Sequence, residues 1–561
     1  MTPLHLRRAV LVLGLLACGT SLESSPPAFA LARFGEAGSA QADSLAVRFS
    51  PSAGTFVGSE TVTLGVRGSA SQGGASQGGA SIHYTLDGSL PTATSPVYRE
   101  PVTLDKSTRL RAVAIAPGAS QGPVATEIYL RVNPDTENFT SHLPIILIHT
   151  FESGTLDTYA TEHVSSALMV LEPTSGTSRI VGRAALDSRI GMRVRGESSR
   201  RFPKKQYAIE LRADEDDSDS GRPVLGLPSH SEWVISDPVL YDRSLIRNAL
   251  AYALSNRIGR YAPRTRFAEA FMVDDGGDVR AAHFYGFFTL IEKIERDPQR
   301  VNVSRLPASA ARSPDVTGGF IIRIDKGVPD FDAGGRWLQF VYPNAEDMAL
   351  QERKPQLDFI RGFIDSFGQA ASATDFRHPS TGQHYSAFID VDAWIDHNII
   401  NALAKNVDAL RISAYFHKER DGLPRAESRG RLAAGPVWDF DRSLGTPYDP
   451  RATEPEEWNV AWGGADYFNE GWWRLLFRDP AFRSRYQARF KALLNGEFSA
   501  DNLDRIVDGM ASEVGDAADR NFRRWTQFPP LDNSHAAEIA LLKDFLRRRV
   551  AWIKTQLETN F

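Results

Sequence analysis

A single cysteine, Cys18, limits what this chain can fold into, because no disulfide can form within it. The 561 residues are 42% hydrophobic and 24% charged, the composition of ordinary globular domains. We therefore expect about two to four domains, each stabilised by a packed apolar core. The formal net charge of −5 argues against general nucleic-acid binding, which usually needs a basic face.

Residues 1–32 have the pattern of an export signal. Arg7-Arg8 precede an apolar run at 9–17, which is too short to span a membrane. Two processing sites compete: Leu15-Leu16-Ala17-Cys18 resembles a bacterial lipoprotein box with Cys18 lipidated, whereas Ala28-Phe29-Ala30 resembles an ordinary signal-peptidase site. We favour the lipoprotein, because the only cysteine stands where that chemistry needs it. The chain is then expected to be exported and lipid-anchored at the bacterial cell envelope, or secreted if the second site is used.

Short alternating strands dominate residues 46–133. We expect them at 45–49, 60–66, 82–86, 110–114 and 127–132, with a Ser-Gln-Gly-Gly-Ala tract at 71–80 as a loop. This spacing predicts an antiparallel immunoglobulin-like sandwich. The run 82–92, with Tyr98 and Leu110-Arg111-Ala112, resembles the small immunoglobulin-like domain at the C-terminus of chitobiases. That resemblance implies a spacer, with binding of a surface polysaccharide as the alternative.

Residues 143–480 mix strands and helices, and residues 481–561 are predicted to form a charged helical extension. Strands are expected at 143–148, 192–195, 206–211, 284–291, 415–416 and 437–438. Helices are expected at 245–258, 355–368, 386–403 and 537–557. The predicted fold class is therefore multidomain, with an all-β sandwich, an α+β domain and a helical C-terminal extension.

A basic loop connects the expected strands at 192–195 and 206–211. It places six cations around a glycine and two hydroxyl groups: Arg193, Arg195, Gly196, Ser198, Ser199, Arg200, Arg201, Lys204 and Lys205. Backbone amides at a glycine turn and flanking cations suit phosphate oxygens. The alternative is a solvated basic hairpin that binds nothing.

Three carboxylates stand next to apolar segments, where they are costly to desolvate unless something pairs with them. Asp439 and Asp441 follow the expected strand at 437–438, and a divalent cation would pair with both through oxygen. Asp408 follows a helix and precedes a strand, where it can orient a hydroxyl group. The alternative is a structural ion pair, Asp408 with Arg411 or Asp441 with Arg442.

Other motifs narrow the function classes. The sequence contains no Walker P-loop, no His-Glu-x-x-His zinc motif and no Gly-x-Ser-x-Gly elbow. Trp458, Trp462, Trp472 and Trp473 suit either a sugar groove or a core, and a core is the commoner role of such aromatic residues.

The basic loop, a helix, a strand, Asp408 and then Asp439 follow one another in the order of the parts of a protein-kinase fold. This part of the chain resembles the CotH family of spore-coat-protein kinases and their secreted bacterial relatives. The resemblance covers about 143–450 and is carried by the segments 195–199, 203–207, 247–248, 286–294, 406–408, 438–441 and 444–445.

This resemblance implies an atypical protein-kinase-like fold that transfers phosphate from ATP, with Mg²⁺ or Mn²⁺, to Ser or Thr hydroxyl groups of a surface or secreted protein. Lys205 would pair with the ATP phosphates, and Arg195, Ser198 and Ser199 would also bind phosphate. Glu292 would lie near the hinge on the adenine side.

The same resemblance assigns the catalytic and metal-binding residues. Asp408 would orient the acceptor hydroxyl, Asp439 would bind Mg²⁺, and Asp441 would be a second ligand. Ser413 stands where a kinase catalytic loop has a metal-binding Asn, and its hydroxyl is a weaker ligand. Because ATP is scarce outside the cytoplasm, a weak or inactive relative that serves as a surface adhesion or binding module is the alternative function.

Overall fold

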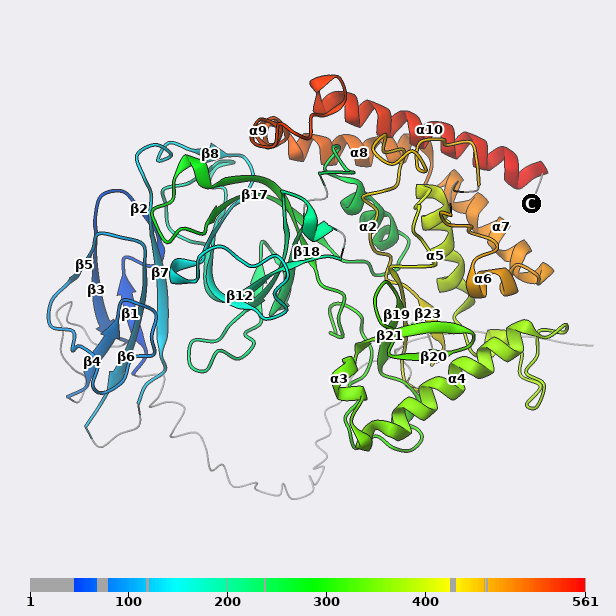
Figure 1. Cartoon of the computed structure of the whole chain (residues 1–561), viewed down its shortest axis with the longest axis horizontal. Coiled ribbons are helices and arrows are strands. Elements are labelled where there is room, and N and C mark those ends of the chain that lie inside the picture. Colours follow the sequence, from blue (N-terminus) through cyan, green and yellow to red (C-terminus); the bar gives the residue numbers. More distant parts are fainter. Residues whose placement is uncertain are drawn as a thin grey trace, which may run out of the picture.

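A computed structural model describes residues 45–67, 79–117, 121–197, 199–236, 239–423, 430–458, 460 and 463–559. The leader with Cys18, and also Ser198, Trp462 and most of the 71–80 tract, lie outside the described residues. A β-rich N-terminal domain is followed by an α/β region that ends in helices (Figure 1). The predicted multidomain layout is confirmed at this level. None of the described helices is long and apolar enough to cross a membrane.

The N-terminal domain packs two sheets, with strand orders β1-β3-β5 and β2-β7-β6-β4. Its strands are β1 Val47–Ser50, β2 Gly54–Phe56, β3 Glu60–Val66, β4 Ser81–Thr85, β5 Val102–Leu104, β6 Thr108–Ile115 and β7 Ala125–Arg131. Alternate residues of facing strands, such as Val62, Leu64, Leu110 and Ala112, are buried in one apolar cluster. Because side chains alternate across a strand, this pattern places one face of each sheet in the core.

The second domain begins with a closed barrel in the strand order β10-β12-β13-β16-β18-β17-β9. Its strands are β9 Ile145–His149, β10 Val164–Leu171, β12 Leu186–Arg195, β13 Gln206–Leu211, β16 Glu232–Ser236, β17 Thr265–Val273 and β18 Phe284–Glu292. A two-stranded sheet of β8 Thr140–Ser141 with β11 Ser178–Arg179 and a hairpin of β14 Arg222–Val224 with β15 Leu227–His230 accompany it. The expected pairing of 192–195 with 206–211 is confirmed, and it sets Arg195 opposite Gln206 at the end of the ladder.

The sandwich packs against the outside of the barrel. On β9, Ile146 and Ile148 face the barrel interior, while Ile145 and Leu147 share an apolar cluster with Ile128 and Leu130 of β7. This explains why β9 is buried on both faces and apolar throughout. Polar contacts reinforce the joint, as Thr55 donates its backbone N–H to the carbonyl of Gly182 at 2.9 Å.

Two carboxyl groups at this joint make its stability depend on pH. Glu127 accepts a hydrogen bond from the backbone N–H of Ala53, and Asp187 accepts one from that of Ile128 at 3.0 Å. Burial raises the pKa of Glu127 to about 7 and that of Asp187 to about 6, and the charge of Asp187 raises the pKa of Glu127 further. A raised pKa means that the folded chain binds protons more tightly than the unfolded chain, so stability from these groups is present at low pH and is lost as pH rises from about 4 to 7.

We predict that the double variant Glu127→Gln, Asp187→Asn has a thermal midpoint roughly 2–4 °C above that of the wild type at pH 8, because it removes the two buried charges and keeps their hydrogen-bond acceptors. The difference should shrink towards zero by about pH 4, where the wild-type groups are protonated. Differential scanning calorimetry of both proteins across this range measures it. A difference that stays constant with pH contradicts the prediction.

The C-terminal half contains a five-stranded sheet in the order β20-β21-β19-β22-β23 and most of the helices. The strands are β19 Phe320–Ile324, β20 Phe331–Ala333, β21 Arg336–Tyr342, β22 Ala414–Lys418 and β23 Leu432–Ala434. The helices are α2 Arg247–Arg257, α3 Ala345–Met348, α4 Lys354–Ser372, α5 Val391–Ala404, α6 Gly471–Leu476, α7 Pro480–Asn495, α8 Ala500–Val514, α9 Asp516–Arg524 and α10 His535–Thr559. Short 3₁₀ turns lie at 151–153, 199–201, 281–283, 315–317, 351–353, 385–387 and 531–533.

One large apolar cluster runs from α2 through the sheet to α10. Helices α7 to α10 therefore share the core of the preceding region, and Figure 1 shows α8 and α10 lying side by side above α2. The expected strand at 437–438 is wrong: β23 ends at Ala434, and Gly435 to Phe440 form an irregular segment. Pro436 lacks the N–H that a central strand would need to donate.

Candidate active site

A polar cleft of about 340 Å³ lies between the end of the barrel and the C-terminal half. Among the described residues, its lining includes six cationic side chains: Arg193, Arg195, Arg200, Arg323, Lys326 and Arg442. It also includes five carboxylates: Glu197, Asp325, Asp408, Asp439 and Asp441. Opposite charges thus meet in one cleft, which is what a site for a metal-bound polyanion requires.

Asp439 and Asp441 lie close enough for their carboxyl groups to share a hydrogen bond. Desolvation by the walls of the cleft raises the pKa of both groups, and the charge of Asp439 raises that of Asp441 further. The positive charge of Arg195 lowers the pKa of Asp439, but by less than burial raises it. Two carboxylates that favour holding a proton between them are a donor set that a divalent cation would bind.

Helix α2 holds the segment that carries this pair. Asn248 accepts a hydrogen bond from the backbone N–H of Phe440 at 2.7 Å, and the hydroxyl of Tyr252 accepts one from that of Asp439 at 3.3 Å. The Tyr252 ring stacks on Trp438 with centroids 5.7 Å apart. These contacts support Asp439 in the left-handed conformation at φ 68°, which costs a non-glycine residue about 1–3 kcal/mol.

Asn248 and Tyr252 were missed as functional residues by the sequence interpretation. Asn248 was noted only as part of the family resemblance. The signal was available, because two polar side chains four residues apart share one face of a helix. Their role depends on the contact of that face with the 438–441 segment, which no sequence spacing reveals.

Arg195 places a positive charge beside Asp439. It lies at the end of β12, donates to the Gln206 side-chain oxygen at 3.3 Å, and places its guanidinium 5.5 Å from the Trp438 ring centroid. Burial lowers its pKa, and the nearby Asp439 charge opposes that change. Ser199 also lines the cleft, as expected, whereas Ser198 lies outside the described residues.

The structure places Lys205 away from the carboxylates. Its ammonium group donates to the backbone carbonyl of Arg200, and Lys205 does not line the cleft. Lys204 is buried and donates to the carbonyl of Phe287 at 2.6 Å and to Asn521 at 2.7 Å. The side chain of Arg195, not that of either lysine, therefore faces the carboxylates.

Glu292 is likewise absent from the cleft. It is fully buried and forms a two-point ion pair with Arg264 at 2.6 and 2.9 Å. The hydroxyl of Tyr261 donates to the same carboxylate at 3.2 Å. In this structure Glu292 fixes the start of the segment that leaves the barrel and offers no free group to a nucleotide.

Asp408 also lines the cleft, three residues after Lys405, which has a left-handed conformation and caps the end of α5. Arg411 contacts it at 2.8 Å, so the ion pair weighed from the sequence is present. Arg442 and Arg451 reach it at 3.6 Å each. The second ion pair considered from the sequence, Asp441 with Arg442, is not observed. Within the described residues Arg442 forms ion pairs with Asp449 and Asp408.

Ser413 stands beside the carboxylate pair, with its hydroxyl 3.4 Å from an Asp439 oxygen. Among the described residues, no group of three or more His, Cys, Asp and Glu side chains is arranged to hold a metal ion. Proteins usually hold Mg²⁺ through one or two carboxylates together with waters and substrate phosphates. Asp439 and Asp441 are two carboxylates that line the cleft.

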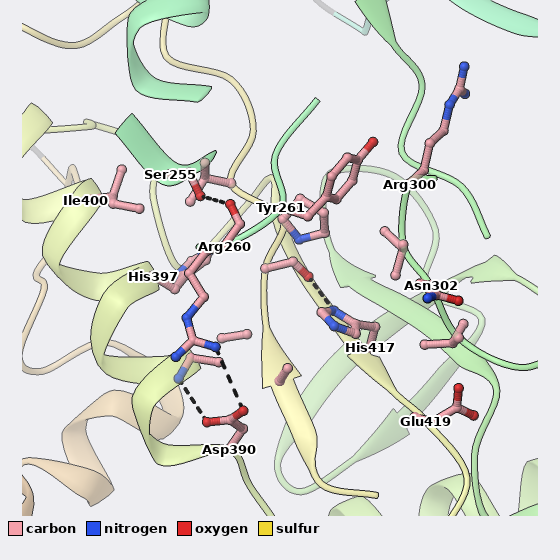
Figure 2. A pocket seen from close by; sticks show the side chains of 18 residues that line it. Ser255, Arg260, Tyr261, Arg300, Asn302, Asp390, His397, Ile400, His417 and Glu419 are labelled. Atoms are coloured by element: carbon pink, nitrogen blue, oxygen red, sulfur yellow. Dashed lines mark hydrogen bonds and ion pairs between the residues drawn. The ribbon is translucent and has the colours of Figure 1, made fainter. Parts of the chain in front are cut away.

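A second cavity of about 140 Å³ lies on the other side of Gly435–Val437 (Figure 2). In Figure 2, Arg260 points towards Asp390, and a nitrogen of His417 lies 3.1 Å from the carbonyl of Gly435. Burial lowers the pKa of His397 in its wall to about 4, which leaves that imidazole neutral at pH 7. Neither Asp439 nor Asp441 lines this cavity, so it is separate from the carboxylate site.

Comparison with known protein families gives two matches. The model of a family described as CotH kinase protein matches residues 192–553. The model of the chitobiase/beta-hexosaminidase C-terminal domain matches residues 51–126. No curated protein matches the chain. Both matches agree with the two resemblances noted from the sequence, in the same order.

Proposed function

The chain belongs to the CotH kinase protein family, and from this premise we propose that it transfers the γ-phosphoryl group of ATP to a Ser or Thr hydroxyl of a protein. The observation that carries the proposal is that the carboxylate pair of Asp439 and Asp441 lines the same cleft as several arginines. Phosphoryl transfer depends mainly on positioning and on charge stabilisation, which these two sets of side chains supply.

In this proposal Asp439 and Asp441 hold Mg²⁺, which when bound would neutralise charge on the phosphates. Arg195 and Arg323, which both line the cleft, would contact phosphate oxygens. Asp408 accepts a hydrogen bond from the acceptor hydroxyl and aims its oxygen at the γ-phosphorus. A new phosphorus–oxygen bond forms to the hydroxyl, the bond to the ADP oxygen breaks, and the hydroxyl proton passes to Asp408 and then to water.

The three arginines around Asp408 refine its role. They compensate its charge and hold its carboxylate in one orientation, with Asp449 in turn fixing Arg442 and Arg451. A carboxylate so paired is better suited to orienting the hydroxyl than to removing its proton early. Orienting the hydroxyl is sufficient when the transition state is loose, because the bond from the acceptor oxygen to phosphorus is then only slightly formed.

Two further parts of the proposal concern location. We propose that the chain is exported, with Cys18 as a lipid anchor, and that the chitobiase-like sandwich acts as a spacer or contacts a surface polysaccharide. The support is the leader sequence for the first and the family match for the second. The broad contact between sandwich and barrel favours a rigid spacer.

The proposal predicts that Mg²⁺-ATP raises the thermal midpoint of the full chain and that labelled phosphate passes from ATP to a protein acceptor. Asp408→Asn should lower kcat about 10²-fold and retain the nucleotide-induced shift, because Asp408 faces the acceptor. A filter-binding assay with mixed bacterial envelope proteins measures transfer. No shift and no transfer in the wild type would favour the binding-module function instead.

A further inference from the structure

A surface groove of about 360 Å³ lies beside Trp458, Phe468 and the helices α6 and α7. Aromatic side chains and exposed arginines line it: Trp458, Phe468, Phe477, Arg474, Arg478 and Arg483, with Asn469. The proposed phosphoryl transfer uses none of these residues. The groove therefore needs a separate explanation.

The aromatic residues form a packed wall. Phe468 meets Trp458 and Phe477 edge-on, with both pairs of ring centroids 5.0 Å apart. The Trp458 ring also contacts Trp552 at 4.9 Å, and Arg549 lies over it at 5.5 Å. Because these neighbours already cover Trp458, the groove suits an inserted apolar side chain better than a sugar ring that needs an open aromatic face.

Structure also separates the tryptophans that the sequence grouped together. Trp472 and Trp473 are each 1% exposed and belong to the core, as expected for aromatic residues at such a position. Trp458 is only partly buried and borders the groove. Trp472 and Trp473 are therefore core residues, whereas Trp458 borders a groove.

The arginines at the rim carry uncompensated charge. All three are exposed, and none has a carboxylate within 4.0 Å among the described residues. Arg478 donates to the backbone carbonyl of Ser372 at 3.1 Å and lies over the Phe376 ring at 5.8 Å. By contrast, Arg485 on the same helix as Arg483 pairs with Asp392 at 2.7 Å. Three arginines that lack a carboxylate partner among the described residues lie beside an apolar groove, and their charges favour an anionic ligand.

Hydrogen bonds connect residues beside the groove to the loop that carries Asp408. Ala465 donates its backbone N–H to the carbonyl of Val407 at 2.9 Å, and the Tyr467 hydroxyl donates to that of Asn406 at 2.9 Å. The residues directly before Phe468 thus rest on the residues directly before Asp408. A ligand in the groove would be held at a constant position relative to the acceptor site.

We propose that this groove docks an acidic segment of the acceptor protein, with carboxylates on the arginines and an apolar side chain against the aromatic wall. The inference rests on the proposed function, since it names a property of that function's substrate. Docking would raise the effective concentration of the acceptor hydroxyl at Asp408 without contributing to the transfer step.

The test uses a fluorescein-labelled dodecapeptide made of Glu-Glu-Phe repeats, with binding followed by fluorescence anisotropy on the full chain without nucleotide. We expect the triple variant Arg474→Gln, Arg478→Gln, Arg483→Gln to bind at least about tenfold more weakly than the wild type. The matched control is Arg312→Gln, Arg505→Gln, Arg523→Gln, whose arginines are also exposed and lack an ion pair among the described residues. The control should bind like the wild type.

Two peptide controls test each half of the groove. Replacing Glu by Gln should remove binding through lost charge, and replacing Phe by Ala should weaken it through the lost anchor. The proposal is overturned if the wild type does not bind the peptide or if the two triple variants bind it equally. It is also overturned if polygalacturonate occupies the groove and the peptide does not.

The binding assay is independent of phosphoryl transfer. Peptide binding without transfer to any protein would reject the proposed function and leave the groove as a docking site. Transfer to a protein acceptor without peptide binding would reject the docking site and leave the kinase.

Discussion

Replacing Asp439 by Asn is expected to lower kcat for phosphoryl transfer by at least about 10³-fold. The proposed metal contributes several kcal/mol to the transition state, and each 1.4 kcal/mol is about a factor of ten. Without the Asp439 charge, Asp441 alone would have to hold the ion. Transfer of labelled phosphate at saturating Mg²⁺-ATP measures the loss.

Folding provides the control for this prediction. Because two close, desolvated carboxylates repel each other, Asp439→Asn should leave the metal-free thermal midpoint unchanged or raise it. The same variant should lose the thermal shift that Mg²⁺-ATP causes. A variant that unfolds more easily would show a structural role for Asp439, and one with wild-type kcat would reject the metal site.

Replacing Arg195 by Met lowers kcat/KM for ATP about 10²-fold, whereas Lys205→Met changes it less than about threefold. The sequence resemblance assigned phosphate binding chiefly to Lys205. In the structure, the Lys205 ammonium is turned to the carbonyl of Arg200, while Arg195 faces the carboxylate pair. The two variants therefore separate the sequence-based assignment from the structural one.

Steady-state kinetics with varied ATP measures both variants, and their metal-free thermal midpoints serve as controls. Arg195→Met should retain its fold, because the apolar Met side chain can still pack against the Trp438 ring and the hydrogen bond to Gln206 that it loses is long, at 3.3 Å. A large loss in Lys205→Met with Arg195→Met near the wild type would restore the original assignment. It would also imply that the loop at 196–205 rearranges when ATP binds.

Local pattern was enough to predict part of the elements. Alternation predicted the sandwich strands β1, β3, β4, β6 and β7 but missed β2 and β5, and helical spacing predicted α2, α4, α5 and α10 within about five residues of their observed bounds. The barrel strands β10, β16 and β17 and most of the five-stranded sheet were not predicted. The family assignments are confirmed by the two matches. The strand at 437–438 failed because a short apolar run does not distinguish a strand from a buried irregular segment, and Pro436 favours the latter.

The sequence by itself determined the order of the parts and the candidate carboxylates, because apolar periodicity and motif order are local properties of the chain. Tertiary structure alone decided which charges meet. It put Arg195 at the cleft and Glu292 against Arg264, it set Asn248 under Phe440, and it brought Arg442 and Arg451 to Asp408. A charged side chain can turn to either side of its strand or loop, and only the packed neighbours show which partner compensates it.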